Sequence, residues 1–247
     1  LERIVLADGC HCSRTMSRQL EAIERLGRCY LLGLRNGARW GSESGRILRR
    51  MGDMVDALVT PDGGLAGLAD SDRYADWRGP LSMLKSTFPD TLFSLPTGPT
   101  TASLWSSDGY SWNGRVAIGE KPSTVLLAQG GLAVVRSGFS SEASMLVLEN
   151  GINGDPASHR GNLAVQYEAF GQPILVDPGQ WVYGEDEDRF WVTSSYAHNT
   201  VLPEGAPPLQ GNGDARRWKQ FFIRGTLVWG QWSWRPTKRS ARSPACC

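Results

Sequence analysis

Apolar residues in roughly the first 90 positions recur every three or four residues, the spacing of one face of an α-helix. The first series is Met16, Leu20, Ile23, Leu26, Tyr30 and Leu34. The second is cleaner and consists of Ile47, Leu48, Met51, Met54, Val55 and Leu58. We expect Ser42 or Ser44 to cap this second helix and the turn sequence Thr60-Pro61-Asp62-Gly63-Gly64 to end it. Two amphipathic helices joined by a polar loop predict antiparallel helical packing.

From about Phe88 onward the pattern changes to short apolar runs separated by Pro, Gly, Ser and Thr. Within the run 163–170, apolar and polar residues alternate, which is the period of a half-buried strand. The following Gly171 and Pro173 predict a turn into another strand. The predicted strands are 132–136, 145–148, 163–170 and 173–176.

Helices followed by antiparallel strands predict an α+β chain with a β-sandwich after the helical part. We place the helical part at residues 1–92, the sandwich at 93–214 and a tail at 215–247. We expect residues 1 to about 90 to be mostly helix and about 95 to 210 to be mostly strand.

The tail is basic and rich in tryptophan. It has eight Lys or Arg residues, no acidic residue and four of the ten tryptophans, but little periodicity. One interpretation is a surface that binds polysaccharide or nucleic acid. The other, which we favour, is truncated or frame-shifted sequence that does not complete the sandwich.

The overall composition is that of an ordinary globular protein. The 247 residues are 40% hydrophobic and 21% charged, with a net charge of +1. This balance does not indicate a nucleic-acid partner, and the absence of a long apolar run predicts no transmembrane helix. The chain begins LERIVLADG, without Met or a signal-peptide pattern, and we expect its natural start to lie upstream.

The five cysteines do not form a disulfide framework for a chain of this size. Cys10, His11 and Cys12, together with Cys29, offer thiolate and imidazole ligands for a metal. The simpler interpretation, which we favour, is a loop leading into a helix with incidental thiols.

The three histidines can be interpreted one at a time. His159 opens a predicted strand in PASHRGNLAVQYEAFG, Asp177 ends the next strand in QPILVDPGQW, and His198 lies in VTSSYAHNTVL. A hairpin brings the first two together, and two imidazoles with one carboxylate form a zinc ligand set with one open position. Spacing alone favours the alternative of hydrogen-bonded structural histidines and an ordinary Asp-Pro-Gly turn.

Residues 131–203 resemble the central β-sandwich of heparinase II/III-like proteins. The matching parts, in the family's order, are Arg136-Ser137, His159, the turn Val176-Asp177-Pro178-Gly179, and Ala197-His198-Asn199-Thr200. DGCHCSR and PDGGL in the helical half are similar, more loosely, to the end of the family's α/α toroid. The resemblance implies a toroid remnant followed by an antiparallel β-sandwich. It also implies a metal, generally zinc, held by His159, Asp177 and His198.

Family members cleave uronic-acid polysaccharides by β-elimination, which needs a base, an acid and a group that stabilises the carboxylate. This chain departs from the family pattern. Ala157 stands where many members have a second histidine, and Gly161 stands where an acidic residue is common. The stretch SRTMSRQ, at 13–19, stands where the toroid has a Tyr-His pair. The metal frame is therefore present, and most of the proton-transfer set is missing.

Four further residues are candidates for contact with substrate. Tyr183 lies on the loop after Asp177 and is our choice as the catalytic residue, because loops at strand ends often carry catalytic groups. Tyr196 is a second choice, although a packed structural tyrosine is the simpler interpretation for each. Arg160 and Arg189 are predicted to bind an acidic sugar through bidentate pairing. Alternatively, Arg189 neutralises the acidic run 185–188.

We therefore expect a polysaccharide lyase-like protein that is periplasmic or secreted, uses Zn²⁺, and has an acidic polysaccharide as partner, with no nucleic acid and no membrane. One alternative is a non-catalytic, glycan-binding sandwich, which the missing acid and base favour. The other is a metal-dependent hydrolase that activates water at the open zinc position.

Overall fold

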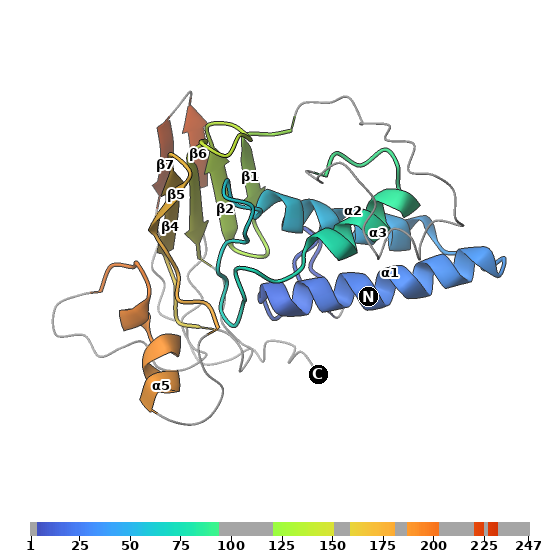
Figure 1. Cartoon of the computed structure of the whole chain (residues 1–247), viewed down its shortest axis with the longest axis horizontal. Helices are drawn as coiled ribbons and strands as arrows, with labels where there is room; N and C mark the ends of the chain where they lie inside the picture. Colours follow the sequence, from blue (N-terminus) through green and yellow to red (C-terminus); the bar gives the residue numbers. More distant parts are fainter. Residues whose placement is uncertain are drawn as a thin grey trace.

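The computed structural model describes residues 4–93, 121–150, 159–180 and 187–202, and the backbone of 220–224 and 227–231. Three helices come first, and a five-stranded antiparallel sheet lies beside them (Figure 1). The helices are α1 (Met16–Arg35), α2 (Ser42–Ala57) and α3 (Arg78–Thr87). The α+β class predicted from the sequence is confirmed. No helix in these ranges is long and apolar enough to cross a membrane.

Both predicted helices form, but the start of α2 differs from the expectation. Thr15 caps α1 by accepting a hydrogen bond from the backbone N–H of Arg18. Gly41 precedes α2 and provides no side-chain cap, so the prediction that Ser42 or Ser44 caps this helix is wrong. Ser42 is already the first helical residue, and Glu43 adds a favourable negative charge to the first turn.

Helix α3 was not predicted as a separate element. Its sequence begins Arg-Gly-Pro, which resembles a loop, yet proline is tolerated in the first turn because its missing N–H has no helical partner there. Asp76 accepts hydrogen bonds from the backbone N–H groups of Arg78 and Gly79, each at 3.1 Å. An aspartate just before the first turn was the available signal for this helix.

The sheet has the strand order β1-β2-β3-β4-β5, and each strand is antiparallel to its neighbour. The strands are β1 (Thr124–Leu127), β2 (Leu132–Arg136), β3 (Met145–Glu149), β4 (Ala164–Ala169) and β5 (Gln172–Leu175). The four predicted strands correspond to β2–β5 within one residue at each end, whereas β1 was missed.

The register gives the sheet two sides with different surroundings. On the helix-facing side Leu132, Val134, Met145 and Val147 are each at most 2% exposed and join the helices in one hydrophobic cluster. That cluster continues through Ile23, Leu48, Met51, Met54 and Leu84. On the outer side, alternate residues such as Leu146, Leu148 and Val165 are half-buried. The core therefore lies between the helices and one side of the sheet.

Two elements replace what the sequence indicated was loop. Helix α5 (Glu187–Thr193) begins in the acidic run 185–188, beyond the loop on which we placed Tyr183, and the short 3-10 helix η1 (Ser195–Ala197) precedes His198. In the tail, β6 (Gln220–Arg224) and β7 (Leu227–Gln231) pair as an antiparallel hairpin, although we read little pattern there.

Candidate metal centre

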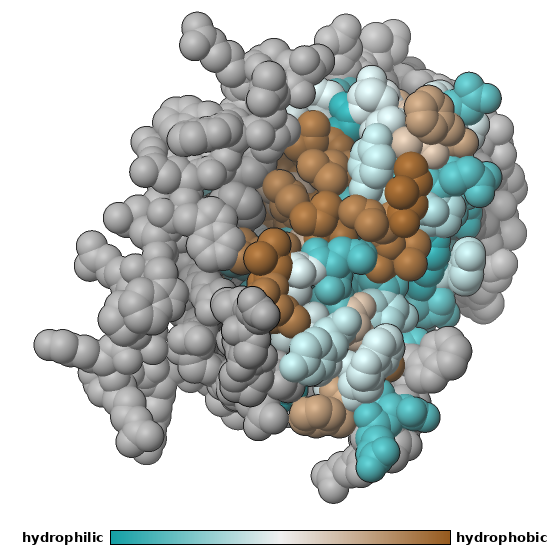
Figure 2. Space-filling model, turned by 90° about the vertical axis from the view of Figure 1, so that its left-hand side faces the viewer, coloured by the Kyte–Doolittle hydropathy of each residue, from teal (hydrophilic) through white to brown (hydrophobic). Residues whose placement is uncertain are grey.

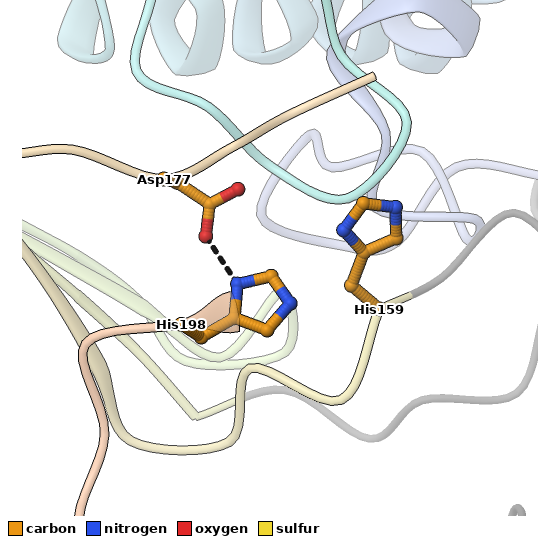
Figure 3. A group of neighbouring side chains, drawn as sticks. All are labelled: His159, Asp177 and His198. Atoms are coloured by element: carbon orange, nitrogen blue, oxygen red, sulfur yellow. Dashed lines mark hydrogen bonds and ion pairs between the residues drawn. The ribbon is translucent and has the colours of Figure 1, made fainter. Parts of the chain in front are cut away.

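The three predicted ligands come from three different connections at one end of the sheet. His159 precedes β4, Asp177 follows β5, and His198 follows η1 directly. One ligand atom of each lies within 4.8 Å of the others. All three side chains are almost fully buried and are turned toward one another (Figure 3). The predicted convergence is thus present in the fold.

The β4–β5 hairpin explains how His159 and Asp177 meet. Its two turn residues, Phe170 and Gly171, have φ angles of 56° and 68°, which tightly reverse the chain. After β5, the Asp177 carboxylate accepts a hydrogen bond from the Gly179 N–H at 2.9 Å, which closes the Asp-Pro-Gly turn. A Cβ at Gly179 would lie 2.5 Å from the Ser71 carbonyl oxygen, and φ there is +59°. The turn therefore requires glycine at this position.

Asp177 orients His198. Its Oδ2 lies 2.5 Å from Nδ1 of His198, which places the ring proton on Nδ1. The opposite atom, Nε2, is buried and has no hydrogen-bond partner in the described part of the chain. Burial lowers the pKa of His198, but the hydrogen bond and charge of Asp177 outweigh this effect, and the pKa is raised.

Asp70 orients His159 in a corresponding way from the opposite side. Its Oδ1 lies 2.9 Å from Nε2 of His159, and Arg189 bonds both carboxylate oxygens. Burial raises the pKa of Asp70, but hydrogen bonds and charges from His159 and Arg189 lower it below its usual value. Nδ1 of His159, which faces the cluster in Figure 3, is buried without a partner among the described residues.

These atoms fit a divalent cation. Two buried imidazole nitrogens without partners face a carboxylate, and the ring centroids are 5.3 Å apart. Leaving such nitrogens unsatisfied is costly, whereas a metal ion would engage both lone pairs. Neutral imidazole and ionised aspartate are the forms that bind zinc.

Sequence reasoning missed Asp70. The Asn199 side chain, next to His198, donates to the Val176 carbonyl at 2.8 Å and holds the end of β5. Asp70 lies 89 positions before His159, and no local pattern links the two residues. The acidic character of the loop ADSDR, just after PDGGLAGL, was the available signal.

A second residue missed from the sequence is Glu149, the last residue of β3. Burial raises its pKa to about 8, and the charge of Asp177 acts in the same direction, while His198 and Arg14 oppose it. Glu149 is thus a buried carboxyl that holds its proton near neutral pH beside the cluster. Its place in an apolar run, MLVLE, gave no sign of this.

The other predicted site residues fall in different places. Tyr183 lies outside the described residues. Tyr196 is in η1 and is 54% exposed. Arg160 is half-buried, and its backbone N–H donates to the Thr193 carbonyl at 2.9 Å. Arg189 forms an ion pair with Asp70. Neither of our predictions for Arg189, sugar binding or neutralisation of the acidic run 185–188, included this partner. The catalytic and sugar-binding roles of these residues stay predictions.

The alternative metal site near the N-terminus does not form. Cys12 is disulfide-bonded, so it cannot serve as a thiolate ligand, and our expectation of incidental thiols overlooked this bond. Cys10 is a buried free thiol and Cys29 an exposed one. Nδ1 of His11 lies 2.7 Å from the Ser13 hydroxyl, an ordinary local hydrogen bond.

The segment that holds this cluster matches a known protein family. Residues 120–235 match the family described as "Heparinase II/III-like, C-terminal". The resemblance to this family is confirmed. The match includes His159, Asp177 and His198 and runs into the tail as far as residue 235. This extent argues against our interpretation of that part of the tail as frame-shifted sequence.

Solved structures with this fold include heparinases. Heparan sulfate lyase HepC from Pedobacter heparinus has a TM-score of 0.73 at 18% identity, covering 92% of this chain and 34% of that one. A structure titled heparinase III, the BT4657 gene product with methylated lysines, has a TM-score of 0.75 at 19% identity, covering 92% and 34%. The chain thus spans about a third of the length of these heparinases. No curated protein matches the sequence.

Proposed function

We propose that this chain is part of a polysaccharide lyase-like protein that acts on uronic-acid-containing polysaccharides by β-elimination and holds a metal through His159, Asp177 and His198. The observation that carries the proposal is the convergence of these three side chains within 4.8 Å, inside a segment that matches the heparinase II/III-like domain. We also propose a toroid remnant at 1–92, a sandwich at 93–214 and a separate tail.

Different side chains of this protein would bind the metal and transfer the proton. His159 would offer Nδ1, His198 Nε2 and Asp177 a carboxylate oxygen, and zinc, when bound, would supply a fixed positive charge. Because these atoms are buried, a largely structural metal fits them better than one that meets the polymer. We assign proton transfer to Tyr183 and contact with the acidic sugar to Arg160 and Arg189. For Arg189 this role requires that it share its guanidinium with Asp70.

A second candidate function, a non-catalytic glycan-binding protein, is favoured by one observation. The stretch that replaces the family's Tyr-His pair has a structural use here. Ser13 bonds the His11 ring and Thr15 caps α1, so both hydroxyls serve the local fold. Ala157, two positions before His159, also lacks a titratable side chain. In this version the sandwich and metal frame persist without an acid and a base.

We expect an acidic polysaccharide as the partner, in the periplasm or outside the cell. The disulfide bond at Cys12 supports an oxidising compartment. The family resemblance supports a uronate polymer, because a β-elimination requires a carboxylate beside the carbon that loses its proton.

The deciding experiment combines metal analysis of the purified chain with incubation over several uronate polymers, including alginate and a heparin-like glycan. Elimination produces an unsaturated uronate that absorbs in the ultraviolet, whereas hydrolysis does not. We expect stoichiometric zinc and weak turnover or none. Binding without any product would favour the second candidate, and a metal-free protein would contradict the proposed site. Robust turnover would show that the missing Tyr-His pair is dispensable.

A further inference from the structure

Residues 66–73, the loop between α2 and α3, join the helical part of the chain to the sheet. Gly67 exchanges two hydrogen bonds with the buried side chain of Gln166 on β4: its N–H donates to Oε1 at 3.0 Å, and its carbonyl accepts from Nε2. Arg73 pairs with Glu168, two residues further along β4, at 2.5 Å. The loop is therefore attached to the helix-facing side of the sheet at both of its ends.

The middle of the same loop is attached to α1 and to the connection that follows β5. The Ser71 hydroxyl accepts a hydrogen bond from the N–H of Met16 at 2.8 Å, at the first residue of α1. The Ser71 carbonyl accepts from the N–H of Gln180 at 2.9 Å, three residues after Asp177. Ser71 thus links the start of a helix to the chain segment that carries a candidate ligand.

Asp70 lies between these attachments, and its carboxylate is 6% exposed. Because Asp70 accepts a hydrogen bond from the N–H at Nε2 of His159, the lone pair of that ring is left on Nδ1, the atom that faces Asp177 and His198. The alternative tautomer would place a proton where a cation must bind. Arg189 holds the carboxylate through both of its oxygens and fixes its orientation.

From this geometry we propose that Asp70 is a positioning residue for the metal site, supplied by the helical part of the chain, and that metal binding is coupled to docking of the 66–73 loop on the sheet. The inference rests on the proposed metal site. The three ligands come from the sheet part, but the group that prepares His159 comes from outside it. His198 has no such dependence, since Asp177 from the sheet part orients it.

Coupling of this kind is reciprocal. If the docked loop favours the metal-binding tautomer of His159, then bound metal favours the docked loop by the same factor. Partners of metal-bound histidines typically change metal affinity by about 10- to 100-fold when they are removed. We expect loss of the Asp70 carboxylate to fall in that range and to loosen the loop as well.

The test uses the full chain and zinc alone. Zinc affinity is measured by competition with a chromophoric chelator for the wild type, Asp70→Asn and Asp72→Asn. Asp72 is the matched control because it lies on the same loop, is exposed, and accepts a bond from the Tyr74 N–H rather than from an imidazole. We expect Asp70→Asn to weaken zinc binding about 10-fold or more. Asp72→Asn should leave the affinity unchanged.

Two measurements on the wild type keep the proposal open to disproof even if Asp70→Asn does not fold. Heteronuclear NMR of isotope-labelled histidine should show the metal-free His159 ring protonated at Nε2, and protonation at Nδ1 instead would overturn the proposal. Hydrogen exchange of residues 66–73 should slow when zinc is added, and unchanged exchange would overturn the coupling. If Asp70 only stabilised the fold, added zinc would leave the hydrogen exchange of residues 66–73 unchanged.

The outcomes separate this inference from the proposed function. If the wild type binds no zinc, the metal site and the role of Asp70 both fail. If the wild type binds zinc and Asp70→Asn binds it equally well, the metal site stands and only the positioning role is refuted. Weakened binding in Asp70→Asn, together with normal binding in Asp72→Asn, supports both.

Discussion

The two sides of the five-stranded sheet bury different kinds of residues. The helix-facing side combines a closed apolar core with polar side chains that bond the 66–73 loop, such as Gln166 with Gly67 and Glu168 with Arg73. The outer side is almost purely apolar, yet Leu126 and Leu175 remain more than 40% exposed. Figure 2 shows apolar residues gathered on this part of the surface. Polar groups thus specify the docking of the helices, while the outer side has the composition of a sheet that needs a second layer.

The largest effect should come from truncating adjacent residues on β3. Met145 is on the helix-facing side and 2% exposed, whereas Leu146 is half-buried on the outer side. Met145→Ala should lower the free energy of unfolding by about 2–5 kcal/mol because it leaves a cavity in the core. Leu146→Ala should cost clearly less, as measured by urea denaturation. Equal losses would break the comparison and indicate that a second layer already covers Leu146.

The next effect concerns the metal at the end of the sheet. Zinc at about 100 times its Kd should stabilise the wild type by about 2.7 kcal/mol and raise its Tm, because zinc binds the folded chain. His198→Ala should abolish this gain and lower the zinc stoichiometry together. His11→Ala is the control, since that ring contacts Ser13 away from the cluster. A wild-type protein that melts identically in zinc and in chelator would refute the site, and so would a His198→Ala protein that keeps the full gain.

A smaller effect is expected for the polar anchor on β4. Gln166→Leu should destabilise the protein by about 1–3 kcal/mol, because the buried N–H and carbonyl of Gly67 both lose their partner. Gln172→Leu, at an exposed position on β5, should stay within about 0.5 kcal/mol. Chemical denaturation of both variants measures the difference. Equal effects would show that polar pairing does not specify this side of the sheet.

Measured over a single pH unit, the smallest expected effect is the pH dependence caused by Glu149. Its folded pKa of about 8 lies above the ordinary 4.5, so the folded state binds more protons than the unfolded state between these values. Stability is therefore highest below the lower value and falls as pH rises toward the upper one, by at most about 1.4 kcal/mol per pH unit. In chelator, Glu149→Gln should flatten this slope, and Glu142→Gln, at an exposed position, should not. Parallel slopes for all three proteins would count against a buried, protonated Glu149.

Local pattern predicted most of the regular structure. Helical spacing located α1 and α2, which each bury one apolar side. Alternation located β4, and short apolar runs next to turn residues located β2, β3 and β5, although β5 is exposed along its whole length. Local pattern failed for β1, which has little alternation in exposure, and for α5, whose acidic start resembles a loop. Residues 94–120 and the segment with Tyr183 lie outside the described residues, so expectations there remain predictions.

The candidate site was predicted only as far as family motifs reach. His159, Asp177 and His198 follow from their motifs and from the hairpin. Asp70 and Glu149 do not, because their roles depend on which groups the fold brings near them and on burial, and neither property is written in the neighbouring sequence. Local sequence motifs identify the metal ligands more readily than the residues that orient those ligands.

Gly179 shows how little variation this arrangement allows. Any other amino acid there would bring a Cβ to 2.5 Å from the Ser71 carbonyl oxygen, in a backbone conformation that already disfavours side chains. The same atoms separate the turn carrying Asp177 from the loop carrying Asp70. A larger residue at position 179 would therefore push the Asp177 turn and the Asp70 loop apart. In a deep mutational scan, Gly179 should be among the least permissive positions, although it contributes no side-chain atom.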